Sequence, residues 1–66
     1  MWTLWWHAGG PGARWVRVFA GPEAQAREMY QRRASGQRSG SLMLMDERQR
    51  PVVRRQFMVP RVTPWR

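Results

Sequence analysis

The chain has no cysteine, and in a protein of only 66 residues this absence constrains the fold more than any other feature. Very small domains are commonly held together by disulfides or by a metal bound to cysteine thiolates, and neither can form here. A chain of this length makes one domain and buries only roughly 60% of its unfolded surface. Its stability must therefore come from packing, from self-association or from a partner. The five tryptophans are the main source of packing, because each can bury a large apolar area.

The amino-terminal residues predict a β-hairpin. Two stretches rich in strand-forming residues, within Trp2–Ala20, flank a segment of glycines and a proline at positions 7–13. Because side chains alternate between the two faces of a strand, we expect one face of the first strand to carry Trp2, Leu4 and Trp6. The opposite face then carries Thr3, Trp5 and His7. In the second strand we expect Val16 and Val18 on one face, and on the other Trp15, Arg17 and Phe19. Both faces contain apolar residues, so the pattern leaves the register open.

A helix is predicted to begin at Gly21-Pro22-Glu23 and to run to about Ser35. Proline suits the first helical position, and a carboxylate in the first turn interacts favourably with the helix dipole. The apolar residues form a single stripe at helical spacing, made of Ala26, Met29, Tyr30 and Ala34. Gly36 is expected to cap the helix. Four arginines are expected to be mostly solvated, namely Arg27, Arg32, Arg33 and Arg38.

A second hairpin is predicted from a short apolar strand at 41–45, a polar turn at 46–50 and a longer strand at 51–59. The last seven residues contain two prolines, which favour an extended chain. We therefore expect an α+β protein with one ββαββ domain over residues 1–59 and an extended tail over residues 60–66. In this fold the helix packs on one face of a small antiparallel sheet.

Six residues give the chain a weak resemblance to small bacterial domains of unknown function. They are Ala24, Ala26, Gly40, Leu42, Leu44 and Asp46. In those domains an alanine-bearing helix is followed by a glycine, a short apolar strand and an acidic turn. The resemblance covers about half of the chain and implies the order strand, strand, helix, strand, strand, without implying an activity. The tryptophan-rich first strand and the basic tail depart from that pattern.

The net charge is strongly positive. All twelve basic residues are arginine and only four residues are acidic, which gives a formal net charge of +8. Such a charge attracts phosphate backbones, anionic membrane surfaces or acidic protein faces. A coding bias in a GC-rich genome would explain arginine in place of lysine, but it would not explain the imbalance of charge.

The residue inventory favours a binding protein over an enzyme. The chain has one histidine, His7, and its only close carboxylates, Asp46 and Glu47, are adjacent in a turn, where side chains diverge. The glycine-rich segment 9–12 lacks the lysine-serine pair and the following helix of a phosphate loop. We expect no catalytic residue, no metal site and no cofactor. No leader is visible and no apolar run approaches the ~20 residues of a membrane span, so we expect no membrane binding and a cytoplasmic location, in a bacterium or in a cell that carries a phage or mobile element.

The candidate binding residues combine aromatic rings with arginines. On the first hairpin they alternate along the strands, an arrangement that can stack bases and hold phosphates, and these candidates are Trp5, Trp15, Arg17 and Phe19. The candidates in the second hairpin and the tail are Arg48, Arg50, Arg54, Arg55, Arg61, Trp65 and Arg66. A tryptophan in so thin a domain is first of all a core residue. One helix covers only one face of a sheet, however. Apolar residues on the other face must therefore be covered by the tail, a second copy of the domain, a partner protein or nucleic acid.

Two functions remain open. In the first, slightly favoured, the domain binds nucleic acid through arginines and exposed aromatic side chains. In the second it is a protein-interaction or assembly element, either a phage or mobile-element accessory protein or a homo-oligomer, that buries its spare apolar sheet face and its tail in a partner. Added salt distinguishes the two, because phosphate contacts are screened and apolar burial is not.

Overall fold

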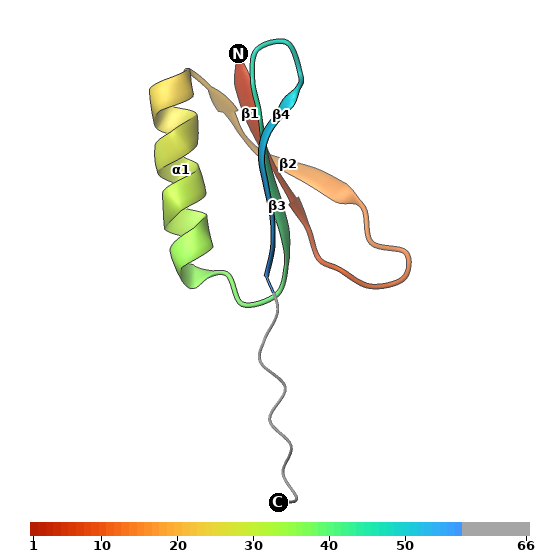
Figure 1. Cartoon of the computed structure of the whole chain (residues 1–66). Helices are drawn as coiled ribbons and strands as arrows, with labels where there is room; N and C mark the ends of the chain where they lie inside the picture. The colour runs from red at the N-terminus through yellow and green to blue at the C-terminus, as the bar shows by residue number, and fades with distance from the viewer. Residues whose placement is uncertain (58–66) are drawn as a thin grey trace, which may run out of the picture.

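The computed structural model describes residues 1–57, and it shows one helix packed against one antiparallel sheet (Figure 1). The strands are β1 (Trp2–His7), β2 (Trp15–Gly21), β3 (Gly40–Met45) and β4 (Pro51–Phe57). The helix α1 (Glu23–Gly36) lies between β2 and β3 in the chain. The expected ββαββ order and the α+β class are therefore confirmed. The expected tail, and the end of the last strand at residues 58–59, lie outside the described residues.

The four strands form a single sheet in the order β2-β1-β3-β4. Each hairpin pairs its own two strands, and the two hairpins are joined by antiparallel pairing of β1 with β3. The inner strands are therefore β1 and β3, which are separated in the sequence by the whole of β2 and α1. Residues directly opposite one another on paired strands point to the same face, so this register decides which side chains meet on each side of the sheet.

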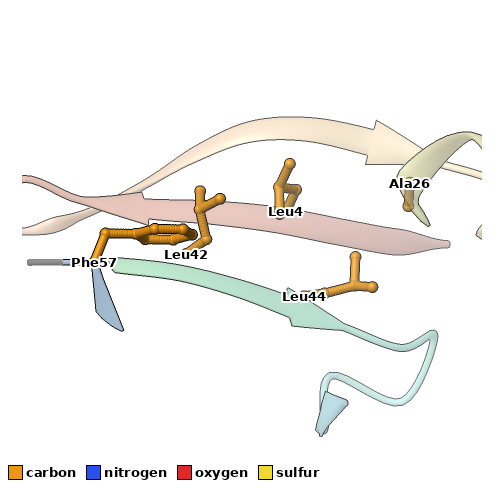
Figure 2. Close-up of a cluster of buried hydrophobic side chains, with 5 residues drawn as sticks. All are labelled: Leu4, Ala26, Leu42, Leu44 and Phe57. Atoms are coloured by element: carbon orange, nitrogen blue, oxygen red, sulfur yellow. The ribbon is translucent and has the colours of Figure 1, made fainter. Parts of the chain in front are cut away.

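The core lies between the sheet and α1. It consists of four strand residues and one helix residue, all of them buried: Leu4, Leu42, Leu44, Phe57 and Ala26. Figure 2 shows the leucines pointing to the same side of the sheet. Leu4 is paired with Leu44, and Trp6 with Leu42, as expected for a face that carries Trp2, Leu4 and Trp6. The other face of the sheet has no helix over it in the described part of the chain (Figure 1), and we call it the open face.

A β-bulge in β2 changes the face of Phe19. Leu4 is paired with Phe19 but the next residue, Trp5, is paired with Arg17, so Val18 is an extra residue in the ladder. The extra residue reverses the alternation, which places Phe19 on the helix side, where it packs against the core. The prediction that Phe19 shares a face with Trp15 and Arg17 is wrong for this reason.

The helix packs through the predicted stripe. Ala26 is fully buried, and the other three members pack against the core: Met29, Tyr30 and Ala34. The predicted ends shift slightly, since Pro22 is the extended residue before the helix, Gly36 is its last residue, and Gln37 is the extended residue that follows. Gly36 is therefore not a left-handed cap. Arg33 is also an exception to the expected solvation of the helix arginines, because it is half-buried and its Nε atom has no hydrogen-bond partner within the described part of the chain.

Gly40 lies where the connection from α1 enters β3 close to the end of β1. Its φ of +83° is in the left-handed region, and a Cβ atom at this position would collide with the backbone oxygen of His7. Only glycine fits both conditions, so this residue allows β3 to start beside β1.

The turn between β3 and β4 is held by the side chain of Asp46. Its Oδ1 atom accepts hydrogen bonds from the backbone N of Arg48 and of Arg50, each at 2.9 Å. The bond from Arg50 is the largest cause that lowers the pKa of the Asp46 carboxyl, and the bond from Arg48 also lowers it. In the same turn Gln49 has a φ of 63°, a left-handed conformation that costs a residue with a Cβ about 1 kcal/mol.

The close approach at Gly40 predicts a large loss of stability for Gly40→Ala. The added methyl group must displace backbone and also holds an unfavourable φ, so the free energy of unfolding should fall by more than about 2 kcal/mol. Gly36→Ala is the matched control, because nothing lies within 4 Å of a Cβ there and φ is not positive. In a helix this change should be neutral or stabilise by up to about 1 kcal/mol. Urea unfolding measures the free energy of unfolding of both variants. Equal changes in the two would contradict the close approach at Gly40.

The left-handed residue in the turn predicts that Gln49→Gly stabilises the protein by about 0.5–1 kcal/mol. The free energy gained by relieving the backbone strain exceeds the free energy lost to the added conformational entropy of the unfolded chain. Gln49→Val should destabilise, because a β-branched residue adopts this conformation poorly. Gln25→Gly, at an exposed site in α1, should lower the free energy of unfolding by about 1 kcal/mol. Thermal unfolding midpoints of the three variants test the assignment, which fails if Gln49→Gly lowers the midpoint as Gln25→Gly does.

Candidate functional site on the open face

The open face is defined by the side chains that the register places opposite the core. Three transverse rows cross all four strands from β2 to β4. The first row is Ala20, Thr3, Met45 and Pro51. The second is Arg17, Trp5, Met43 and Arg54. The third is Trp15, His7, Ser41 and Gln56. Four of the predicted binding residues thus lie together on one face: Trp5, Trp15, Arg17 and Arg54.

Trp5 stands on an inner strand near the centre of this face. Its Nε1 atom donates a hydrogen bond to Oγ1 of Thr3, two residues earlier, at 2.9 Å. This bond fixes the orientation of the indole along β1 and satisfies its only polar atom. Thr3 itself is only 4% exposed although it lies on the open face, while the ring of Trp5 remains half-buried.

Trp15 is held on the edge strand β2 by two contacts. The ring of His7, its partner in the register, lies 5.2 Å away, with the two ring planes tilted by 54°. The guanidinium of Arg54 lies over the indole at 5.8 Å from the ring centroid. Because Arg54 is on β4, the opposite edge of the sheet, the two side chains must extend toward one another over β1 and β3. Together they span the width of the open face.

Both ring nitrogens of His7 contact backbone atoms of the hairpin loop. Its Nδ1 atom accepts a hydrogen bond from the backbone N of Gly9 at 3.0 Å, and its Nε2 atom lies 3.2 Å from the carbonyl oxygen of Ala13. The proton must therefore be on Nε2, which donates to that carbonyl. Through these two nitrogens His7 links the two ends of the loop.

The open face is positively charged. Arg17 and Arg54 lie at its two edges, and both are exposed. All four acidic residues of the chain are elsewhere, with Glu23 and Glu28 on α1 and Asp46 and Glu47 in the turn between β3 and β4. Within residues 1–57, no carboxylate competes with an anionic ligand on this face.

The remaining candidate residues lie apart from these four. Phe19 is on the helix side, as described above. Arg55 also points to that side, opposite Leu42, and its guanidinium lies 4.9 Å from the ring centroid of Phe57. Arg48 and Arg50 are exposed in the β3–β4 turn, beyond the first row of the open face. The other three candidates lie outside the described residues: Arg61, Trp65 and Arg66.

Two members of the open face were not among the candidates from the sequence. Met43 lies between Trp5 and Arg54 in the second row, and His7 supports Trp15 in the third. The alternation of Ser41–Met45 was a usable signal, because it places Met43 opposite to the buried Leu42 and Leu44. What could not be read from the sequence was that β1 is the neighbour of β3.

A metal site and a membrane-spanning helix are both absent from the part of the chain that the structure describes. Residues 1–57 contain no group of three or more histidine, cysteine, aspartate or glutamate side chains that could hold a metal ion. Within the same residues, α1 is neither long enough nor apolar enough to cross a membrane.

Comparison of the chain with protein-family models, with curated proteins and with solved structures finds no significant match. What the protein binds must therefore be inferred from its own residues.

Proposed function

We propose that this protein is a nucleic-acid-binding domain that acts through the open face of its sheet. The observation that carries the proposal is the second and third rows of that face, where Trp5 lies between Arg17 and Arg54 and Trp15 lies beside Arg17 on β2, with no carboxylate among them. Aromatic rings stack on bases of any sequence, and guanidinium groups hold phosphates. Both kinds of contact are available on one surface.

The placement of the two arginines suits a strand of nucleic acid laid on the sheet. They flank Trp5 in the same transverse row, one on each edge strand. A base over the centre of the face would thus have a positive charge on either side for its neighbouring phosphates. The net charge of +8 adds a long-range attraction that raises the rate of encounter.

The helix is a less suitable surface for phosphates, because two of its arginines are paired. Arg27 lies 2.9 Å from the carboxylate of Glu23, and Arg32 lies 3.2 Å from that of Glu28. These exposed pairs stabilise the fold by only a few tenths of a kcal/mol. Their effect on the surface is larger, since each pair cancels one positive charge of the helix.

The alternative function, an assembly element that buries a spare apolar face, gains less support. Among the described residues, the large hydrophobic side chains that are exposed are those of Met1, Val16 and Val52. Val16 lies on the helix side, opposite Trp6, and Val52 is an extra residue of a bulge in β4, without a partner in the rows of the open face. The rings of Trp5 and Trp15, the largest apolar groups on the open face, are already partly covered by Thr3, His7 and Arg54. Less of their surface is therefore left for an apolar partner.

The proposal predicts that Arg54→Gln weakens binding to an oligonucleotide several-fold, whereas Arg55→Gln has a much smaller effect. The two variants lose the same charge at adjacent positions, but Arg54 is on the open face and Arg55 on the other. The slope of log affinity against log salt should fall in magnitude by about 0.7–1 for Arg54→Gln. Fluorescence anisotropy of a labelled oligonucleotide measures both quantities. Equal losses for the two variants would mean that net charge alone governs binding.

Light scattering of the purified protein, at low and high salt and with or without a generic oligonucleotide, tests the proposal against the alternative. We expect a complex with the oligonucleotide that forms at low salt and dissociates as salt is added. A monomer that ignores the oligonucleotide at low salt would overturn nucleic-acid binding. A stable oligomer that persists at high salt and does not bind the oligonucleotide would instead support the assembly element.

A further inference from the structure

We infer that the open face takes unpaired nucleotides, with two consecutive bases splayed apart, one stacked on Trp5 and the next on Trp15. This inference rests on the proposed function and specifies its substrate class, a single strand and not a duplex. Three features of the open face support it: the spacing of the two rings, the width of the sheet, and the position of Arg54.

The two tryptophans start from backbone positions that are further apart than bases that stay stacked on each other. Trp15 is paired with His7, and Trp5 is two residues before His7 on the same face of β1. The two tryptophans are therefore diagonal neighbours, whose backbone positions are about 7–8 Å apart. Adjacent bases in a duplex strand are only about 3.4 Å apart along the axis. Each indole can take its own base only if the two bases unstack from one another, which costs little in a single strand and several hydrogen bonds in a duplex.

The width of the sheet also excludes a groove of a duplex. The major groove is about 12 Å wide and admits a helix or a two-stranded ribbon. Four strands spaced by about 4.8 Å are wider than this before side chains are added. Trp5 is on an inner strand of the four, so it cannot reach base edges inside a groove while both neighbouring strands remain paired. Bases must instead come out to the ring.

Both rings are held in position before any ligand arrives. The hydrogen bond to Thr3 fixes the indole of Trp5, and the ring of His7 supports that of Trp15. His7 is itself fixed by its bonds to Gly9 and Ala13. A preorganised ring loses little side-chain entropy on binding, so most of the stacking energy becomes affinity.

Arg54 marks the place of the second base. Its guanidinium lies over the indole of Trp15 at 5.8 Å from the centroid, on the ring surface that a base would cover. Stacking of the base requires this group to move aside, and a phosphate on either side of the two bases gives it a new partner. Arg54 thus covers the ring in the free protein and holds the backbone in the complex.

The experiment compares three labelled probes whose labelled strand is about eight nucleotides long. The duplex also carries the phosphates of a second strand, so charge alone would favour it. One is a DNA single strand that cannot pair with itself, one is the same strand in a duplex, and one is an abasic phosphodiester of equal length. At matched salt we expect the single strand to bind at least tenfold more tightly than either of the others. Equal binding of all three overturns the inference but leaves nucleic-acid binding intact, whereas no binding of any probe overturns the proposed function itself.

Variants at the two rings locate the bases. Trp5→Leu and Trp15→Leu should each weaken binding of the single strand by about tenfold and leave the abasic probe unchanged, because only the bases lose their stacking surface. Trp5→Phe and Trp15→Phe should recover most of the affinity, since each keeps a ring. Trp5→Phe keeps an aromatic ring but cannot donate the hydrogen bond to Thr3. It therefore separates the contribution of stacking from that of the hydrogen bond. The inference fails if the leucine variants, shown to be folded by circular dichroism, bind the single strand as tightly as the wild type, or lose affinity for the abasic probe in the same proportion.

Discussion

The pairing of β1 with β3 is the interaction on which the rest of the structure depends. Each hairpin is local in sequence, but a two-stranded hairpin is marginal in water. Joining the two through their inner strands places Leu4 opposite Leu44 on one face and Trp5 opposite Met43 on the other. The first pair creates the surface that α1 covers, and the second creates the centre of the open face. One set of backbone hydrogen bonds therefore builds both the core and the candidate site.

The fold could be predicted from the sequence further than the site could. Alternation in the first strand separated Leu4 from Trp5 correctly, because a regular strand needs no knowledge of its partner. The stripe on the helix was readable for the same reason. The face of Phe19 was not, since a bulge exists only relative to a paired strand, and the extra residue at Val18 becomes visible only when the register with β1 is known. The grouping of Trp5 with Arg54 depended on the same information, because the two residues lie on strands far apart in the chain.

Arginine contributes to the fold as well as to the charge. Three guanidinium groups lie over aromatic rings: Arg27 over Trp2, Arg54 over Trp15 and Arg55 over Phe57. In a domain whose buried core contains five hydrophobic residues, long side chains with planar ends cover ring surface on both faces of the sheet. Part of the basic composition is thus accounted for by packing. Net charge alone is a poor guide to the binding surface, and the face on which each arginine lies is the better one.

The contact between Arg54 and Trp15 shows how one arginine can contribute both to packing and to the proposed binding surface. In the free protein the guanidinium covers a ring that would otherwise be an apolar surface inviting aggregation. A cation and an exposed ring attract one another by only about 0.5–1 kcal/mol, which is less than the 1–3 kcal/mol gained when a base stacks on an aromatic side chain. A base can therefore replace the guanidinium at the ring, and the displaced charge is then available to a phosphate. Binding thus replaces the contact of the guanidinium with the indole by two others, a base on the indole and the guanidinium on a phosphate. The affinity depends on the free-energy difference between the new contacts and the lost one, and not on the sum of all contacts in the complex.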